Sequence, residues 1–177
     1  MATYAAFLRG INVGGHKARK EHLVAAFEEC GLEDVSTFRA SGNVIFEAPA
    51  RPKPDTRRME AALQAELGYA VPVFLRSASQ LEKVAAAKPF SAKHLKASKG
   101  KLQVAFLPKK PATGKAKEAL AMALESDPLA LVGTELYWLP ASGTQETDLN
   151  LKSLEKLVGP WTMRTMGTVE QIAVKLC

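Results

Sequence analysis

The spacing of apolar residues over residues 1–76 predicts an alternation of strands and helices. Residues 4–9 form an apolar run typical of a strand, and Leu23, Phe27 and Cys30 fall on one face of a helix over residues 20–31. The other elements expected here are strands at residues 35–40, 44–47 and 71–76 and a helix that carries Met59, Leu63 and Leu67. The order β-α-β-β-α-β is that of a ferredoxin-like unit.

The second half of the chain repeats this order of elements with different residues. The elements expected in it are strands at residues 102–107, 129–132, 136–139 and 161–166 and helices at residues 113–124 and 149–158. The helix caps expected from the sequence are Ser79 with Glu82 for a bridging helix, Asp148 for the helix at residues 149–158, and Thr168 with Gln171 for a C-terminal helix. The pattern therefore predicts a second ferredoxin-like unit.

These elements together predict an α+β fold with two ferredoxin-like subdomains, each built on an antiparallel sheet. The first subdomain covers residues 1–76 and contains a Gly-rich loop. A bridging helix and a basic linker occupy residues 77–101, and residues 102–177 form the second subdomain with the C-terminal helix. A chain of 177 residues is long enough for two small domains, each with its own core.

The composition is that of a globular protein without metal or disulfide chemistry. The chain is 47% hydrophobic and 24% charged, and it has no apolar run long enough for a membrane span. Since no N-terminal signal is visible, we expect a cytoplasmic protein with no membrane partner. The two cysteines and three histidines lack the spacing of a disulfide framework or a zinc site, so we expect no metal. Cys30 is expected to be a small buried residue.

The net charge of +6 is concentrated in one lysine-rich segment. Residues 1–76 contribute +1 and residues 77–177 contribute +5. The lysine-rich segment, residues 88–117, contains nine lysines and no acidic residue, a composition that attracts polyanions. Lysine lacks the planar fork with which arginine reads phosphates and bases, and only Phe90 and Phe106 interrupt the segment. A solvated loop and helix start are therefore favoured over a nucleic-acid surface.

A Gly-rich run after the first strand is the main candidate for a binding site. In a ferredoxin-like unit, the loop after the first strand and the turn after the second lie at one end of the sheet. This topology brings together polar side chains and unhindered backbone amides that suit an anionic ligand. The ligand-binding residues expected from it are Arg9, Gly10, Asn12, Gly14, Gly15, His16, Ser41, Gly42 and Asn43, with Lys17 beside them. Turn geometry alone explains the glycines equally well.

Known nucleotide and catalytic motifs fit this run poorly. Gly10 and Gly15 have the separation of P-loop glycines, but His16 and Lys17 stand where a lysine and a hydroxyl residue are required. No dinucleotide-binding fingerprint is present, and a single aromatic in residues 43–46 disfavours RNA recognition by base stacking. We therefore expect no cofactor. No catalytic base or nucleophile has an assigned partner, so the sequence identifies no reaction.

The C-terminal stretch over residues 162–169 is a second candidate for an anion site. It places Arg164 just before a helix N-terminus, where a positive charge, threonine hydroxyls and backbone donors occur together. Pairing of Arg164 with a carboxylate of the first half is the other explanation, and it is slightly favoured.

Five short motifs run through the chain, at residues 8–15, 41–46, 104–107, 135–138 and 162–164. Together they resemble the bacterial family known as domain of unknown function 1697. The resemblance covers nearly the whole chain and implies two ferredoxin-like subdomains in a small cytoplasmic protein, with no established activity. Thr165, Met166 and Gly167 stand where the family usually has Asn-Trp-Asn, which weakens any family role of that segment. The flanking residues that still match are Thr162, Arg164, Thr168 and Val169.

The leading hypothesis is a protein that binds a small anionic ligand, phosphorylated or nucleotide-like, between two subdomains. Arg9 and Arg164 would supply charge, and the backbone of the Gly-rich run would donate hydrogen bonds. Asn12, Ser41 and Asn43 would orient the ligand. Two alternatives stay open: nucleic-acid binding through the lysine-rich segment, and a non-catalytic interaction protein in which the glycines serve only turns.

Overall fold

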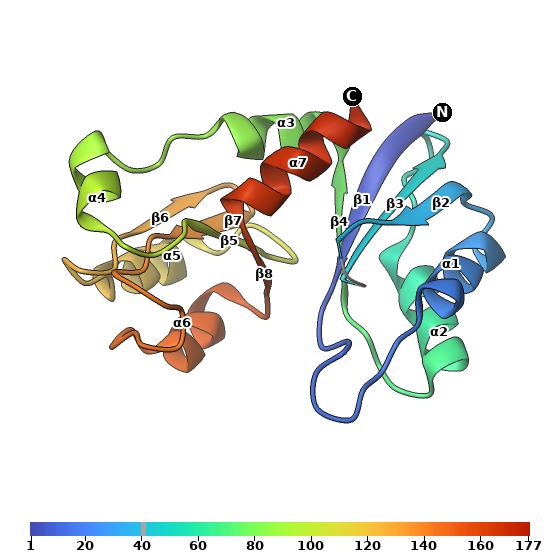
Figure 1. Cartoon of the computed structure of the whole chain (residues 1–177), viewed down its shortest axis with the longest axis horizontal. Coiled ribbons are helices and arrows are strands. Elements are labelled where there is room, and N and C mark those ends of the chain that lie inside the picture. The colour runs from blue at the N-terminus through green and yellow to red at the C-terminus, as the bar shows by residue number, and fades with distance from the viewer. Residues whose placement is uncertain (40–41) are drawn as a thin grey trace. The chain divides into compact units, whose positions relative to one another are not determined.

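The computed structural model describes residues 1–39 and 42–177, and it divides into two compact units. Unit 1 comprises Met1–Glu82 together with Gln171–Cys177, and unit 2 comprises Lys83–Glu170. Each unit is built on its own four-stranded antiparallel sheet with flanking helices (Figure 1). The expected α+β fold with two antiparallel sheets is therefore confirmed. Among the described residues, no helix has the length and apolar character needed to cross a membrane.

Unit 1 has the strand order of a ferredoxin-like sheet. Its elements are β1 (Ala2–Leu8), α1 (Lys20–Glu29), β2 (Glu33–Thr37), β3 (Asn43–Ala48), α2 (Thr56–Leu67), β4 (Val73–Ser77), the first half of α3 (Ala78–Ala86) and the second half of α7 (Met166–Leu176). The strands lie in the order β2-β3-β1-β4, and every neighbouring pair is antiparallel. The central strand β1 is therefore hydrogen-bonded along both edges.

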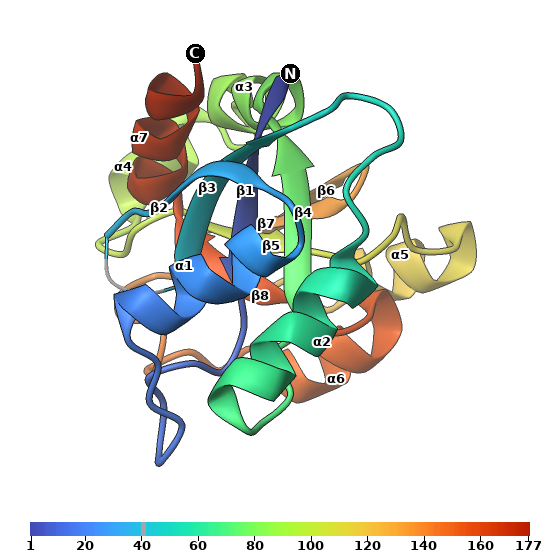
Figure 2. The same cartoon turned by 90° about the vertical axis from the view of Figure 1, so that its right-hand side faces the viewer.

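The core of unit 1 lies where α1 and α2 cover one face of the sheet (Figure 2). Strand residues alternate between the two faces, so that Tyr4 and Phe46 point toward the helices. The rings of Tyr4 and Phe46 stack at 5.7 Å between centroids, and Phe27 of α1 meets Phe46 at 5.6 Å. These aromatic contacts fix how α1 packs on the sheet, and with it the end of the connection that precedes the helix.

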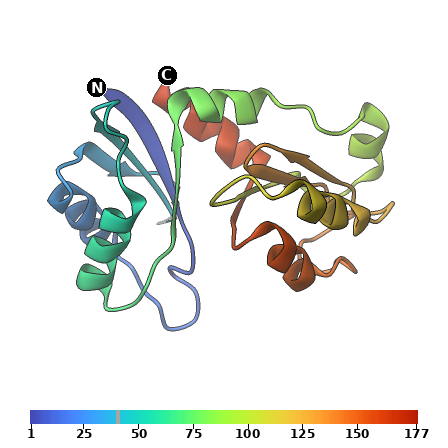
Figure 3. The same ribbon diagram turned by 180° about the vertical axis from the view of Figure 1, so that it is seen from behind.

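Unit 2 repeats the arrangement. Its elements are the second half of α3, α4 (Ala92–Ala97), β5 (Gln103–Phe106), α5 (Thr113–Ala121), β6 (Leu129–Val132), β7 (Glu135–Trp138), α6 (Leu151–Val158), β8 (Thr162–Thr165) and the start of α7. The strand order is β6-β7-β5-β8, and α5 and α6 lie side by side (Figure 3). The short helix α4, which the sequence pattern did not indicate, begins where the Ser91 hydroxyl accepts a hydrogen bond from His94 N at 3.3 Å.

The helix caps expected from the sequence are wrong at three places. Ser77, not Ser79, forms the capping box of α3: its Oγ accepts from Gln80 N at 3.3 Å, and its N donates to Gln80 Oε1 at 2.9 Å. In α6 the cap is Asn150, whose Oδ1 accepts from Ser153 N at 3.1 Å, where Asp148 was expected.

The third error concerns the helix that closes the chain. Helix α7 begins at Met166, and the hydroxyl of Thr165 accepts from Thr168 N at 3.4 Å, where Thr168 itself was expected to be the cap. Both α3 and α7 follow a strand without any loop. The last strand residue then becomes the capping residue, and the local sequence pattern does not show where a strand ends.

A buried carboxylate organises the polar part of unit 2. Asp127 is 3% exposed and accepts hydrogen bonds from Trp138 Nε1 at 3.1 Å, Thr147 Oγ1 at 2.8 Å and Ser126 Oγ at 2.8 Å. Burial alone would raise the pKa of Asp127, but the hydrogen bonds from Ser126, Thr147, Trp138 and the backbone outweigh it and lower the pKa. The ionised carboxylate therefore stabilises the folded unit.

Replacing this carboxylate should cost stability in a pH-dependent way. We expect Asp127→Ala to lower the free energy of unfolding by about 2–3 kcal/mol near neutral pH, because the buried Trp138 indole loses its acceptor. The folded pKa lies below the ordinary value of 3.8, so this loss is fully present above that value. It disappears as the pH falls through the folded pKa.

Denaturant unfolding followed by tryptophan fluorescence measures this loss, since Trp138 and Trp161 both lie in unit 2. The exposed Asp148 supplies the control, because Asp148→Ala makes the same charge change and should cost less than about 0.5 kcal/mol. If Asp127→Ala lowered the free energy of unfolding by the same amount at every pH, the stabilising role of the Asp127 charge would be contradicted.

Candidate functional site

The candidate site is the β1–α1 connection, residues 9–19, and its base is set by the strands on either side. Leu8 N donates to Gly42 O at 2.9 Å, and Arg9 N donates to Pro72 O at 3.1 Å. The strand pairing also sets Asn43 opposite Phe7. The sheet topology therefore brings Gly42 and Asn43 beside the start of the connection, as the predicted order of elements requires.

Asn43 closes the turn between β2 and β3. It is 3% exposed, and its Nδ2 donates to Phe38 O at 3.0 Å and to Arg39 O at 3.3 Å. The side-chain amide thus holds the two strands together at the turn. Ser41, also expected to bind the ligand, lies outside the described residues.

Asn12 shapes the neck of the connection. Its N donates to His16 O at 2.6 Å, and His16 N donates to Val13 O at 3.1 Å, which makes a small hairpin. The Asn12 Oδ1 accepts from Ala18 N at 3.0 Å and ties the two ends of the hairpin. Asn12 has a positive φ of 55°, a conformation that asparagine tolerates better than most residues. Asn12 therefore serves the loop's own geometry.

The tip of the connection exposes backbone donors. Gly14 and Gly15 are both exposed, and within the described part of the chain no group accepts a hydrogen bond from either amide. An added Cβ would meet no atom within 4 Å at either glycine. Gly14 has a φ of +61°, which disfavours any other residue, whereas Gly15 has no such requirement. The turn geometry therefore requires glycine at position 14, whereas neither the backbone conformation nor the surrounding space requires it at position 15.

Tyr69 holds the far side of the hairpin in place. The His16 ring stacks on the Tyr69 ring with centroids 4.2 Å apart and an angle of 11°, and Tyr69 Oη donates to Lys17 O at 2.9 Å. Desolvation raises the pKa of Tyr69, which keeps the hydroxyl protonated as a donor. Tyr69 was not identified as a site residue from the sequence. Its one local signal there is its position directly after Gly68, the glycine that ends α2.

The connection ends at a helix terminus that lacks a capping side chain. Arg19 is the N-cap of α1, and no side chain among the described residues accepts from the first-turn amides. By contrast, Asp55 caps α2 through Arg57 N. Residues 9–20 contain four lysines and arginines and no acidic residue, and Glu21 is the acidic residue of the first turn. Positive charge at a helix N-terminus is electrostatically unfavourable unless an anion offsets it.

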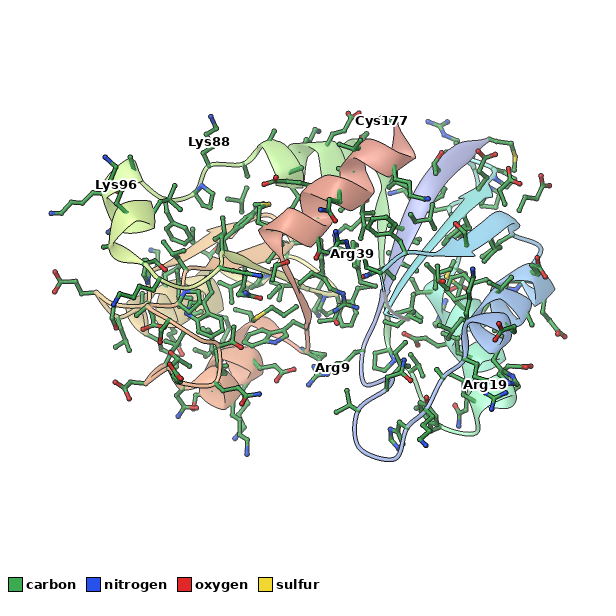
Figure 4. All side chains as sticks on the ribbon, in the orientation of Figure 1. Arg9, Arg19, Arg39, Lys88, Lys96 and Cys177 are labelled. Atoms are coloured by element: carbon green, nitrogen blue, oxygen red, sulfur yellow. The ribbon has the colours of Figure 1, made fainter. Side chains whose placement is uncertain are left out.

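The cationic residues of the connection are distributed along it. Arg9 lies at its β1 end and Arg19 at its α1 end (Figure 4). Lys17 and Lys20, both exposed, lie close in sequence to Arg19. Arg19 and Lys20 were not singled out in the sequence, although the absence of Ser, Thr, Asp or Asn before α1 was visible there.

Arg164, the remaining predicted site residue, lies in unit 2. It is on the edge strand β8 and its Nη1 donates to Thr162 Oγ1 and to Met163 O, each at 2.8 Å. Desolvation lowers the pKa of Arg164 to about 10, so that the guanidinium stays charged at neutral pH. Arg76 occupies the matching edge strand of unit 1, is 6% exposed and donates from Nη1 to Leu75 O at 2.9 Å. The sequence pattern did not indicate that Arg76 and Arg164 lie on equivalent edge strands of the two units.

The two glycines at the tip should respond differently to the same substitution. We expect Gly14→Ala to lower hydrogen-exchange protection of the Asn12 and His16 amides by about tenfold, because a positive φ costs an alanine roughly 1–2 kcal/mol. Gly15→Ala should leave that protection unchanged, since its Cβ meets open space. Amide exchange measured by NMR compares the variants, and equal losses would show that positive φ is not what Gly14 provides.

Comparisons with known proteins agree with this fold. A family model described as "Protein of unknown function (DUF1697)" matches residues 1–137. A conserved bacterial protein from Streptococcus pneumoniae has a similar structure with a TM-score of 0.75 and 21% sequence identity, over 99% of this chain and 98% of that chain. The search of curated proteins found no match. Because the family model matches more than half of the sequence, the chain belongs to the DUF1697 family, as its motifs predicted.

Proposed function

We propose that unit 1 binds a small anionic ligand, phosphorylated or nucleotide-like, through the β1–α1 connection. The observation that carries the proposal is the N-terminus of α1, where first-turn amides without a capping side chain stand among lysines and an arginine. Helix N-termini bind phosphate because their backbone donors and their dipole both favour negative charge. An anion at this position would accept from the Lys20 and Glu21 amides and offset the charges of Lys17, Arg19 and Lys20.

The hairpin of the connection supports the same proposal. The exposed amides of Gly14 and Gly15 add donors that have no acceptor within the described residues. Asn12 and Tyr69 hold the hairpin, so its donors are fixed before a ligand arrives. Such preorganisation reduces the entropy lost on binding.

The other residues expected from the sequence stay predictions for the same ligand. Arg9, Gly42 and Asn43 lie at the base of the connection, and Arg164 lies in unit 2. Replacing each of these residues in turn and titrating the variant with pyrophosphate would show whether that residue contributes to ligand binding. A cytoplasmic location also stays a prediction, and no cluster of side chains within residues 1–39 and 42–177 argues for a particular reaction.

Inorganic pyrophosphate, titrated at constant ionic strength, tests the proposal by NMR. We expect saturable shifts of the Lys20 and Glu21 amides, with smaller shifts at Gly14 and Gly15. Arg19→Ser should weaken pyrophosphate binding about tenfold because it removes a charge-assisted contact. The same variant should be more stable than the wild type by about 0.5–1 kcal/mol, since serine supplies the missing cap.

Arg57→Ser is the matched control for this substitution. Arg57 is also an exposed arginine at the start of a helix of unit 1, but Asp55 already caps that helix. The control should leave pyrophosphate affinity unchanged. Equal weakening by both variants would point to unspecific charge attraction, and the absence of amide shifts at α1 would sink the proposal.

Nucleic-acid binding through the lysine-rich segment is a second candidate function. Its nine lysines are all exposed, which favours contact with phosphates. Phe90 and Phe106 are buried, so neither offers a surface for base stacking. Binding of single- and double-stranded DNA and RNA at two salt concentrations decides this candidate. We expect weak binding that falls steeply with salt, and no binding at the lower salt concentration would exclude it.

A further inference from the structure

Helix α4 of unit 2 stands beside a cavity that its own side chains do not fill. The helix has six residues, Ala92–Ala97, and none of them is buried. Its one large apolar side chain, Leu95, is 49% exposed. A six-residue helix without buried residues gains little from packing, so an apolar partner beside it would stabilise it.

The cavity is lined mainly by apolar side chains and has a volume of about 550 Å³. Phe90 and Met166, 9% and 7% exposed, belong to its wall. Met166 N donates to Leu102 O at 2.8 Å, and this hydrogen bond joins the start of α7 to the residue before β5, both of which line the cavity. The small side chains of Ala85, Ala87 and Ala92 leave the space open. This volume lies within the roughly 300–1,000 Å³ of small-molecule pockets.

The cavity lining carries one charge of each sign, and the segment that contributes Lys88 and α4 adds further positive charge. Lys88 and Glu170 are its two charged lining residues. Residues 88–96 contain Lys88, Lys93 and Lys96 and no acidic residue, and Lys88 and Lys96 extend from this part of the chain into solvent (Figure 4). Several like charges near an open rim raise the local potential and favour an anionic group there.

We propose that this cavity binds a small amphiphile with an apolar tail and an anionic head, of the class of an alkyl carboxylate. The tail lies against Phe90, Leu95 and Met166 and removes their surface from water. The head stays at the rim, in the field of the lysines. This site differs from the β1–α1 connection in its unit and in its chemistry, because it selects a ligand by apolar burial.

Decanoate, used below its micelle concentration, tests the cavity in the full-length chain with ¹³C-methyl-labelled methionine. The cavity contains Met166, whereas a second, 570 Å³ pocket in unit 1 contains Met59. We expect a saturable shift of the Met166 methyl signal and none for Met59. Removing methylene groups from the probe should weaken binding about fourfold for each group.

Two substitutions on α4 locate the site. Ala92 lines the cavity, whereas Ala97 is exposed at the other end of the same helix and does not line it. Ala92→Trp should weaken decanoate binding at least tenfold, and Ala97→Trp should leave it unchanged. Equal effects of the two variants would overturn the assignment.

The head group is tested on the wild-type protein, which keeps the proposal falsifiable if a variant fails to fold. Decanoate should bind more tightly than decanol, and decanol more tightly than decyltrimethylammonium. Lys88→Glu should weaken decanoate binding severalfold, whereas Lys53→Glu, at the rim of the unit 1 pocket, should not. If decyltrimethylammonium bound more tightly than decanoate, the assignment of an anionic head group would be wrong.

A lipid surface is the competing occupant, and vesicles separate it from a small amphiphile. Vesicles of phosphatidylcholine and phosphatidylglycerol are sedimented with the protein. No co-sedimentation, together with the Met166 shift produced by decanoate, supports the proposal. Co-sedimentation without a decanoate shift at Met166, or no response of Met166 to any of the three probes, overturns it.

Discussion

The arrangement of unit 1 depends on the hydrogen bonding of β1 along both of its edges. Ala5, Ala6 and Phe7 are fully buried, so both faces of the strand are covered as well. A slip of one residue would exchange the residues on the two faces, which strongly specifies the register. The bonds from Leu8 N and Arg9 N to strand neighbours on opposite sides then fix the point where the chain leaves the sheet. The β1–α1 connection starts from a rigid base for this reason.

Strand β5 has the same place in unit 2. It pairs with β7 on one side and β8 on the other, and Leu107 N donates to Thr134 O at 2.9 Å, as Leu8 N does to Gly42 O. What differs is the segment that follows. Unit 1 continues into a Gly-rich hairpin that Asn12 and Tyr69 hold. Unit 2 continues into residues 108–112, which are exposed except for the half-buried Pro111 and contain two lysines and two prolines. One scaffold therefore carries two chemically different connections.

The helix termini show where backbone donors are already satisfied. Asp55 caps α2, Asn150 caps α6 and Ser91 caps α4, each through a side-chain oxygen. Helices α1 and α5 follow the N-cap residues Arg19 and Ala112, whose side chains have no acceptor for the amides of the first turn. An uncapped terminus costs stability unless water or a ligand supplies the acceptors. The β1–α1 connection differs from the segment before α5 in its Gly-rich hairpin, whose exposed Gly14 and Gly15 amides are additional backbone donors.

The sequence by itself determined the fold class, the order of the strands and the position of the Gly-rich connection. These features follow from local hydrophobic periods and from glycines such as Gly14, whose positive φ is a property of its own backbone. Only the tertiary structure decided the stacking of His16 on Tyr69, the engagement of Asn43 within its turn and the cavity beside α4. It also decided the caps at Ser77 and Thr165, since each depends on where a paired strand ends. Contacts of this kind join residues distant in sequence or depend on strand pairing, and a local pattern carries no information about them.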